Sequence, residues 1–152
     1  MIRKILVAFD DGSQALKALD AAIEIAKNKD IEIHIVSAYT VPIMYQGDIT
    51  SGSVYPDNTA ILDYLYENTR AFLETMLIKA AAKVRQENIP VYTEIVEGSP
   101  GRAITEIAEN SEIDLVCIGS HNRTAVNRFF MGSVSNYVLQ HARCLVLVAK
   151  DE

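Results

Sequence analysis

The chain has 152 residues, 49% of them hydrophobic, which is enough for one domain with a substantial core and too apolar for intrinsic disorder. A formal net charge of -6 argues against nucleic acid as a partner, because phosphate backbones select basic surfaces. A small phosphate ligand is not excluded, since it needs only local donors.

No apolar run nears the length that spans a membrane, and the first run stops at Asp10, too early for a signal peptide. We therefore expect a cytosolic, cytoplasmic protein without membrane contact. Cys117 and Cys144 lie in apolar, strand-like runs and are expected to be reduced, buried thiols. The histidines have no metal-ligand spacing, so no protein-only metal site is expected.

The first part of the chain predicts a strand, a helix and a second strand. Residues 2–9 are an apolar, β-branched run closed by Asp10, as in a fully buried strand. A helix is predicted over residues 13–27, with Ser13 as its N-cap. Its apolar stripe consists of Leu16, Leu19, Ile23 and Ala26. Residues 31–39 predict the second strand.

Residues 40–58 are rich in Pro, Gly, Ser and Tyr and show no clear period. A loop of this length in a compact domain is usually functional or mobile. Its apolar side chains could cover a ligand, pack on the core or contact another subunit.

The second part continues the alternation of helix and strand. A long helix is predicted over residues 59–88. It is followed by a predicted edge strand over residues 91–96, in which apolar residues alternate with polar ones. One face of that helix carries Leu62, Leu65, Phe72, Met76 and Ala80. A helix follows the turn at residues 98–101. The remaining predicted elements are a strand over 114–118, a helix over 133–141 and a strand over 144–148.

Near-continuous apolar strands joined by helices imply a parallel sheet covered by helices on both faces. The fold class is therefore α/β: a single-domain, doubly wound, Rossmann-like sheet of five strands, expected in the order 3-2-1-4-5. No repeat or linker divides residues 1–152. In such sheets ligands bind beyond the carboxyl ends of strands where the strand order reverses. Asp10 and Gly119 end the two strands at that point and would face one crevice.

Residues 119–133 join a buried strand to the last helix through small and polar residues, which is the layout of a phosphate cradle. Small residues admit phosphate oxygens to the backbone, and the N-terminus of the following helix adds partial positive charge. Arg123 and Arg128 can add charge-assisted contacts, and Ser133 and Ser135 can add hydroxyls. The alternative is a surface loop with Ser133 as a plain N-cap.

These residues resemble the universal stress protein family across nearly the whole chain. The family signature is Gly, two residues, Gly, nine residues, Gly, then Ser or Thr. Gly119, Gly132 and Ser133 match it, and Asn122 stands at the second Gly. If the signature needs Gly there for a positive φ, Asn is the least costly replacement. If it needs Gly because a phosphate lies against the Cα, the side chain of Asn122 would clash with that phosphate.

The resemblance implies an ATP site, or one for AMP or ADP, in a homodimeric stress-response or regulatory module. It implies that Asp10 binds the ribose or adenine end and that Ala8 and Ala38 border the adenine. The implied phosphate-binding residues are Gly119, Asn122, Arg123, Gly132, Ser133, Val134 and Ser135. Mg or Mn could be held by the phosphates. The implied dimer forms through the last strand, from Cys144 to Val148.

Three alternatives stay open. Asp10 could instead cap the turn that follows it. The protein could be a ligand-free dimeric interaction module of the same fold, because an apolar edge strand invites a partner. It could also be a slow ATPase, although the loop has no Lys and His121 is its only candidate base. We rank the nucleotide-binding module first and the enzyme last.

Overall fold

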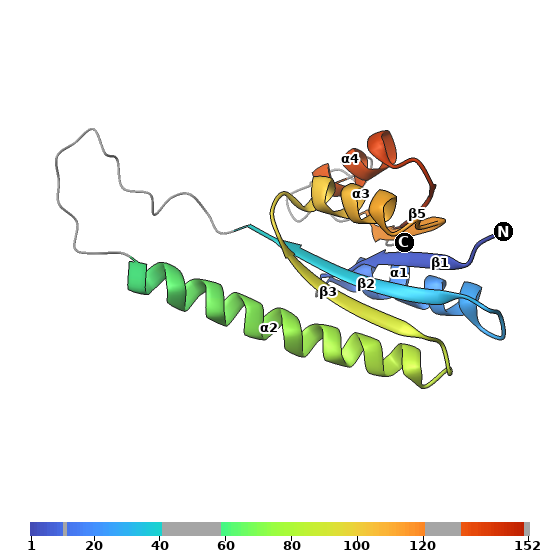
Figure 1. Ribbon diagram of the computed structural model, residues 1–152, viewed down its shortest axis with the longest axis horizontal. Coiled ribbons are helices and arrows are strands. Elements are labelled where there is room, and N and C mark those ends of the chain that lie inside the picture. The colour runs from blue at the N-terminus through green and yellow to red at the C-terminus, as the bar shows by residue number, and fades with distance from the viewer. Residues whose placement is uncertain (11, 41–58, 121–131, 151–152) are drawn as a thin grey trace.

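In the part of the chain that the structure describes, five strands form one parallel sheet in the order β3-β2-β1-β4-β5 (Figure 1). The structure is a computed structural model, and it describes residues 1–10, 12–40, 59–120 and 132–150. The strands are β1 (Lys4–Ala8), β2 (Glu32–Tyr39), β3 (Val91–Glu97), β4 (Leu115–Gly119) and β5 (Leu145–Ala149). The predicted strand order is confirmed, and β3 is an edge strand as expected.

Among the described residues, four helices cover the two faces of the sheet (Figure 1). They are α1 (Ser13–Ala26), α2 (Thr59–Arg85), α3 (Pro100–Asn110) and α4 (Ser133–His141). Side chains alternate between the faces of each strand, so Ile5 and Val7 pack under α1 and α2, and Leu6 and Val116 pack under α3 and α4. All four of these side chains are fully buried. The predicted doubly wound α/β fold is confirmed.

The N-cap predicted for α1 is wrong by one residue. Gly12 occupies the N-cap position, with φ -77° and ψ 153°, and Ser13 is the first helical residue. The Oδ1 atom of Asp10 accepts a hydrogen bond of 2.7 Å from the backbone N–H of Gly12. This short turn is stabilised by the carboxylate before the helix begins, so the serine hydroxyl is not needed as a cap.

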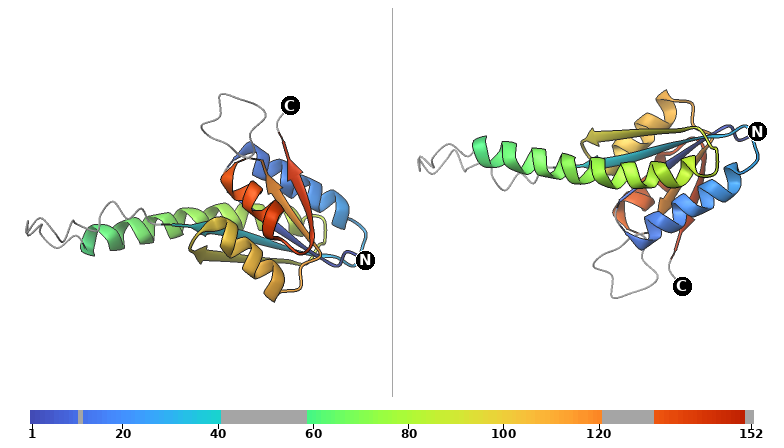
Figure 2. Two further views of the ribbon diagram at one scale, coloured as in Figure 1. Left: turned by 90° about the horizontal axis from the view of Figure 1, so that it is seen from above. Right: turned by 90° about the horizontal axis from the view of Figure 1, so that it is seen from below.

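Two apolar side chains assigned to buried helix faces are exposed. Leu16 of α1 is 45% exposed and Phe72 of α2 is 56% exposed, whereas Leu19 and Ala80 on the same faces are buried. Helix α2 extends past the sheet, and α1 and α2 converge at one end and separate toward the other (Figure 2). The sheet therefore buries only part of each predicted stripe.

The two cysteine thiols differ in how deeply they are buried. Cys117 is fully buried in β4, as predicted, but Cys144 is only half-buried, because it precedes the edge strand β5. In the described ranges, no helix combines the length and the apolar character needed to cross a membrane.

Candidate functional site

One cavity of about 170 Å³ lies at the carboxyl ends of β1, β2 and β4. The strand order reverses between β1 and β4, because β2 and β3 lie on one side of β1 within the sheet, whereas β4 and β5 lie on the other side of β1. Six of the residues singled out in the sequence line this cavity: Ala8, Asp10, Ala38, Gly119, Val134 and Ser135. Its other walls are mostly apolar, as in Ile104 and Ile118.

The apolar part of the cavity is a slot held open by small side chains. Ala8 is 8% exposed and Ala38 is half-buried, and neither fills the space above the strand ends. The end of β1 is held in place because Phe9 N–H donates to the Val36 carbonyl at 2.8 Å and the Ser37 hydroxyl donates to the Phe9 carbonyl at 2.7 Å. The whole cavity is smaller than the ~300 Å³ of a complete ligand site, so its apolar slot suits one part of a ligand, such as a planar base.

Asp10 is exposed at the mouth of the cavity. Its Oδ1 atom takes part in the turn with Gly12, which is the capping role considered as an alternative. A carboxylate has a second acceptor oxygen, and within the described ranges no residue bonds to Oδ2 of Asp10. The turn fixes the side chain and leaves this oxygen for a hydroxyl or amine donor.

Gly119 is needed for helix packing, which the sequence did not reveal. A Cβ at this position would lie 2.8 Å from Cβ of Gln14 and 3.0 Å from its backbone carbonyl carbon. The Ser120 hydroxyl donates to Oε1 of Gln14 at 3.1 Å, which joins the same two segments. Glycine therefore lets the first turn of α1 lie directly on the end of β4.

The N-terminus of α4 supplies the polar end of the cavity. Gly132 is its N-cap, with φ -59°, and no side chain of the described residues caps it. The first helical hydrogen bond runs from Asn136 N–H to the Gly132 carbonyl at 3.0 Å. The N–H groups of Ser133, Val134 and Ser135 precede it and have no partner within the helix, so they carry partial positive charge.

The serines of α4 have different surroundings. Ser135 is buried, and its hydroxyl donates to the Gly132 carbonyl at 3.0 Å. Ser133 is exposed and is the first helical residue, so the plain N-cap role considered for it is wrong. Asn122 and Arg123 lie outside the described residues.

Two further helix N-termini face this cavity. Ala15 in the first turn of α1 lines it, as do Pro100 and Ile104 of α3. Neither the N-cap of α1 at Gly12 nor that of α3 at Ser99 uses a side-chain hydrogen bond. Three helix dipoles converging on one opening favour an anionic group there. The part played by α3 was missed, because nothing in its sequence shows which strand it crosses.

The family comparison identifies the chain. The sequence profile of the universal stress protein family matches residues 1–150. The chain belongs to the universal stress protein family. Universal stress protein MJ0531 of Methanocaldococcus jannaschii is 32% identical over 152 residues, which cover 99% of this chain and 83% of that protein. The solved structure of hypothetical protein MJ0577 has a TM-score of 0.82 at 23% identity and covers 100% of this chain and 98% of its own.

Two solved universal stress proteins contain adenine nucleotides. One is a complex with cAMP, with a TM-score of 0.66 at 20% identity, covering 97% of this chain and 95% of that one. The other, from Arabidopsis thaliana with AMP bound, has a TM-score of 0.66 at 17% identity and covers 99% and 92%. At identities of 20% and 17%, the similarity of these two structures to this universal stress protein establishes a shared fold.

No group of three or more His, Cys, Asp or Glu residues in the described part of the chain could hold a metal ion. An ion held by the phosphates of a ligand stays a prediction, since Mg²⁺ is usually bound by phosphates and water with few protein ligands.

Proposed function

We propose that this universal stress protein binds an adenine nucleotide (ATP, ADP or AMP) and acts as a cytoplasmic regulatory module in the stress response. The observation that carries the proposal is the single cavity lined by Ala8, Asp10, Ala38, Gly119, Val134 and Ser135. These residues come from four separate elements and the turn after β1. The nucleotides in the two related structures make adenine the base of choice.

The proposed ligand lies across the cavity from its apolar slot to the N-terminus of α4. The base occupies the slot between Ala8 and Ala38, and the free oxygen of Asp10 accepts from a ribose hydroxyl. The phosphates accept from the first N–H groups of α4, with Mg²⁺ or Mn²⁺ held by the phosphates. Charge-assisted hydrogen bonds contribute about 1.5–3 kcal/mol each, so a few of them support micromolar affinity, which needs ~8 kcal/mol net.

Calorimetric titration with AMP and with ATP, each with and without Mg²⁺, tests the proposal. We expect saturable heat with a Kd of about 1–100 μM for at least one nucleotide. Mass spectrometry of the denatured, freshly purified protein should detect the same nucleotide. Absence of both signals would refute nucleotide binding.

We also propose a homodimer formed through β5. This strand is the second edge of the sheet, and Leu145 at its start is 62% exposed. An edge strand offers unpaired backbone groups, and two copies can pair about a two-fold axis. Sedimentation velocity at micromolar concentration should show a dimer, and a clean monomer would contradict it.

A ligand-free interaction module is the second candidate. It is favoured by the internal bonds of two proposed ligand-binding side chains, since Asp10 bonds to Gly12 and Ser135 bonds to Gly132. This candidate predicts the dimer without any nucleotide signal. Slow hydrolysis of ATP has no comparable support, because its candidate base, His121, lies outside the described residues.

A further inference from the structure

A second concave site lies between α1 and α2, on the opposite face of the sheet from α3 and α4. It has a volume of about 390 Å³, within the ~300–1,000 Å³ range of small-molecule sites. The exposed side chains of Leu16 and Phe72 both line it. Two apolar residues left out of the core therefore face the same groove.

The groove exists because the two helices diverge. Their C-terminal ends are joined by an ion pair between Lys27 and Glu87, 3.0 Å from Nζ to Oε2. A second ion pair, between Lys83 of α2 and Asp20 of α1, lies further from these ends. From this joined end the helices separate (Figure 2). The space between them is lined by apolar side chains: Phe9, Leu16, Leu19, Phe72, Met76 and Ala80.

The charges at the rim favour an anionic ligand. Lys79 and Lys83 of α2 both border the groove. Lys83 is neutralised by Asp20, but Lys79 has no ion-pair partner among the residues that the structure describes. The hydroxyl of Thr75 is also occupied, because it donates to the Ala71 carbonyl at 3.0 Å. One unpaired cation beside an apolar channel matches a ligand with one negative head and an apolar body.

A second copy of the chain fits this groove less well. Pairing that sets α2 against α2 of the second copy would bring the same lysines together, and like charges oppose that arrangement. The volume is also that of a small ligand. Met76 adds an adaptable wall, since its unbranched side chain fits irregular apolar shapes.

We propose that the groove between α1 and α2 binds a free aliphatic carboxylate, with its chain along Leu16, Phe72 and Met76 and its head group at Lys79. Phe9 is the one residue that lines both this groove and the nucleotide cavity, and the other lining residues of the two sites differ, so nucleotide binding can fail without removing the groove.

Titration of the full-length protein with dodecanoate tests the proposal, with binding followed by calorimetry and by the ¹³C-methyl signals of methionine. We expect saturable binding that shifts the Met76 methyl resonance and leaves that of Met1 unchanged. Dodecanol, which has the same chain without the charge, should bind at least about tenfold more weakly. No binding at about 1 mM dodecanoate, or no change at Met76, would overturn the proposal.

Two variants locate the site. Phe72→Ser and Lys79→Glu should each weaken dodecanoate binding at least about tenfold, and because both side chains are exposed, neither change should unfold the protein. Lys29→Glu is the matched control, since it changes the net charge equally at an exposed site outside the groove, and it should bind like the parent. Equal affinity of all three variants would place the ligand elsewhere and overturn the assignment.

Discussion

Gly101 in the first turn of α3 lies against Tyr137 of α4, so that a Cβ at position 101 would be 2.9 Å from Cδ1 and 3.0 Å from Cβ of the tyrosine. This glycine allows α3 and α4 to pack closely beside the cavity. Because Cβ of Tyr137 cannot rotate away, we expect Gly101→Ala to lower the free energy of unfolding by about 1–3 kcal/mol. Urea denaturation measures the difference.

Gly98→Ala is the control for this packing effect. Gly98 has φ +148° and open space where a Cβ would be, so its substitution acts through backbone strain alone. Tyr137→Ala removes the ring atoms Cγ and Cδ1 but keeps Cβ, so in that background the cost of Gly101→Ala should shrink in part and that of Gly98→Ala should not. An unchanged cost at Gly101 would show that the ring is not the obstacle.

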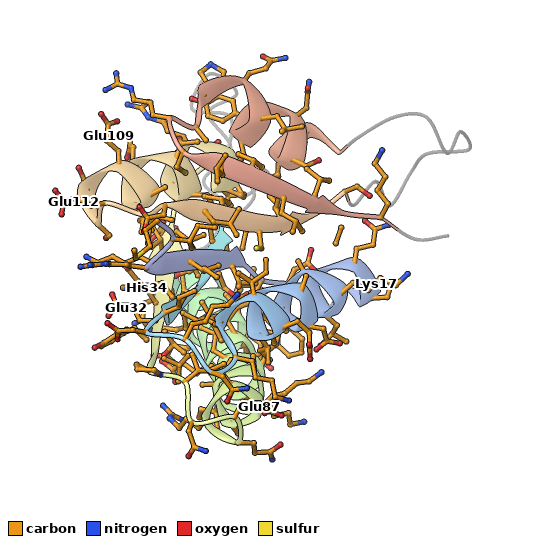
Figure 3. The ribbon with its side chains drawn as sticks, turned by 90° about the vertical axis from the view of Figure 1, so that its right-hand side faces the viewer. Lys17, Glu32, His34, Glu87, Glu109 and Glu112 are labelled. Carbon is orange, nitrogen blue, oxygen red and sulfur yellow. The ribbon has the colours of Figure 1, made fainter. Side chains whose placement is uncertain are left out.

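Glu112 follows α3 with φ 53°, a left-handed conformation that favours glycine, and lies at the outer end of the helix (Figure 3). This conformation costs a non-glycine residue about 1–2 kcal/mol, and glycine would remove that cost. Glycine also increases the conformational entropy of the unfolded chain, which destabilises the folded state by about 0.4–1 kcal/mol. We therefore expect Glu112→Gly to raise the free energy of unfolding by up to about 1 kcal/mol. Glu112→Ala removes the same charge and keeps the strain, so a comparable gain in that variant would reject this cause.

Asp114 ties the start of β1 to β4. Its Oδ2 atom accepts hydrogen bonds from the backbone N–H groups of Arg3 at 2.8 Å and of Lys4 at 3.0 Å, and these bonds lower the pKa of the carboxyl. A lowered folded-state pKa means that this stabilisation is complete above the unfolded-state pKa and is lost as pH falls through the folded-state pKa.

Asp114→Asn should therefore lower the free energy of unfolding near pH 7 by about 1 kcal/mol, a value reduced for solvent screening. The gap between the two proteins should close as the pH falls through the lowered folded-state pKa of Asp114, below which the parent carboxyl is also protonated. Urea denaturation across this pH range measures both. A gap that is constant with pH would show that the charge is not involved.

A larger side chain at Ala38 should lower the affinity for nucleotide, because it would fill the apolar slot of the cavity. Ala38→Leu adds volume where we place the base, so the affinity for AMP should fall at least about tenfold in calorimetry. The melting temperature should change little, because Ala38 is only half-buried. Ala142→Leu, also at a half-buried alanine but outside the cavity, should leave AMP binding as in the parent. Unchanged AMP affinity in Ala38→Leu would show that the base does not bind in this slot.

The thiols predict a difference in reactivity. Burial raises the pKa of Cys117 to about 12 and also raises that of the half-buried Cys144. Since the thiolate is the reactive species, a disulfide reagent near pH 8 should modify Cys144 slowly and Cys117 only after unfolding. Mass spectrometry of the modified peptides reads out both sites. Modification of native Cys117 at the rate seen in denaturant would contradict its burial.

The sequence alone determined the order of helices and strands and the parallel sheet with helices on both faces. Local patterns suffice for these, because apolar runs mark buried strands and the carboxyl ends of parallel strands share one edge of the sheet. The meeting of Asp10 with Gly119 followed from these patterns only with the strand order 3-2-1-4-5 that was expected for such a sheet. The assignments of Ala8 and Ala38 at this edge came from the family resemblance, and the structure places both in the same cavity.

Only the tertiary structure decided how completely each helix is covered and which residues touch across elements. The helical period marks Leu16 and Phe72 as core residues, yet the divergence of α1 and α2 leaves them exposed. The glycine pattern assigns Gly119 to phosphate binding, yet Gln14 occupies the space that a Cβ at position 119 would need. Periodicity reports which face of a helix is apolar, but burial depends on the distance and angle between elements that are far apart in the sequence.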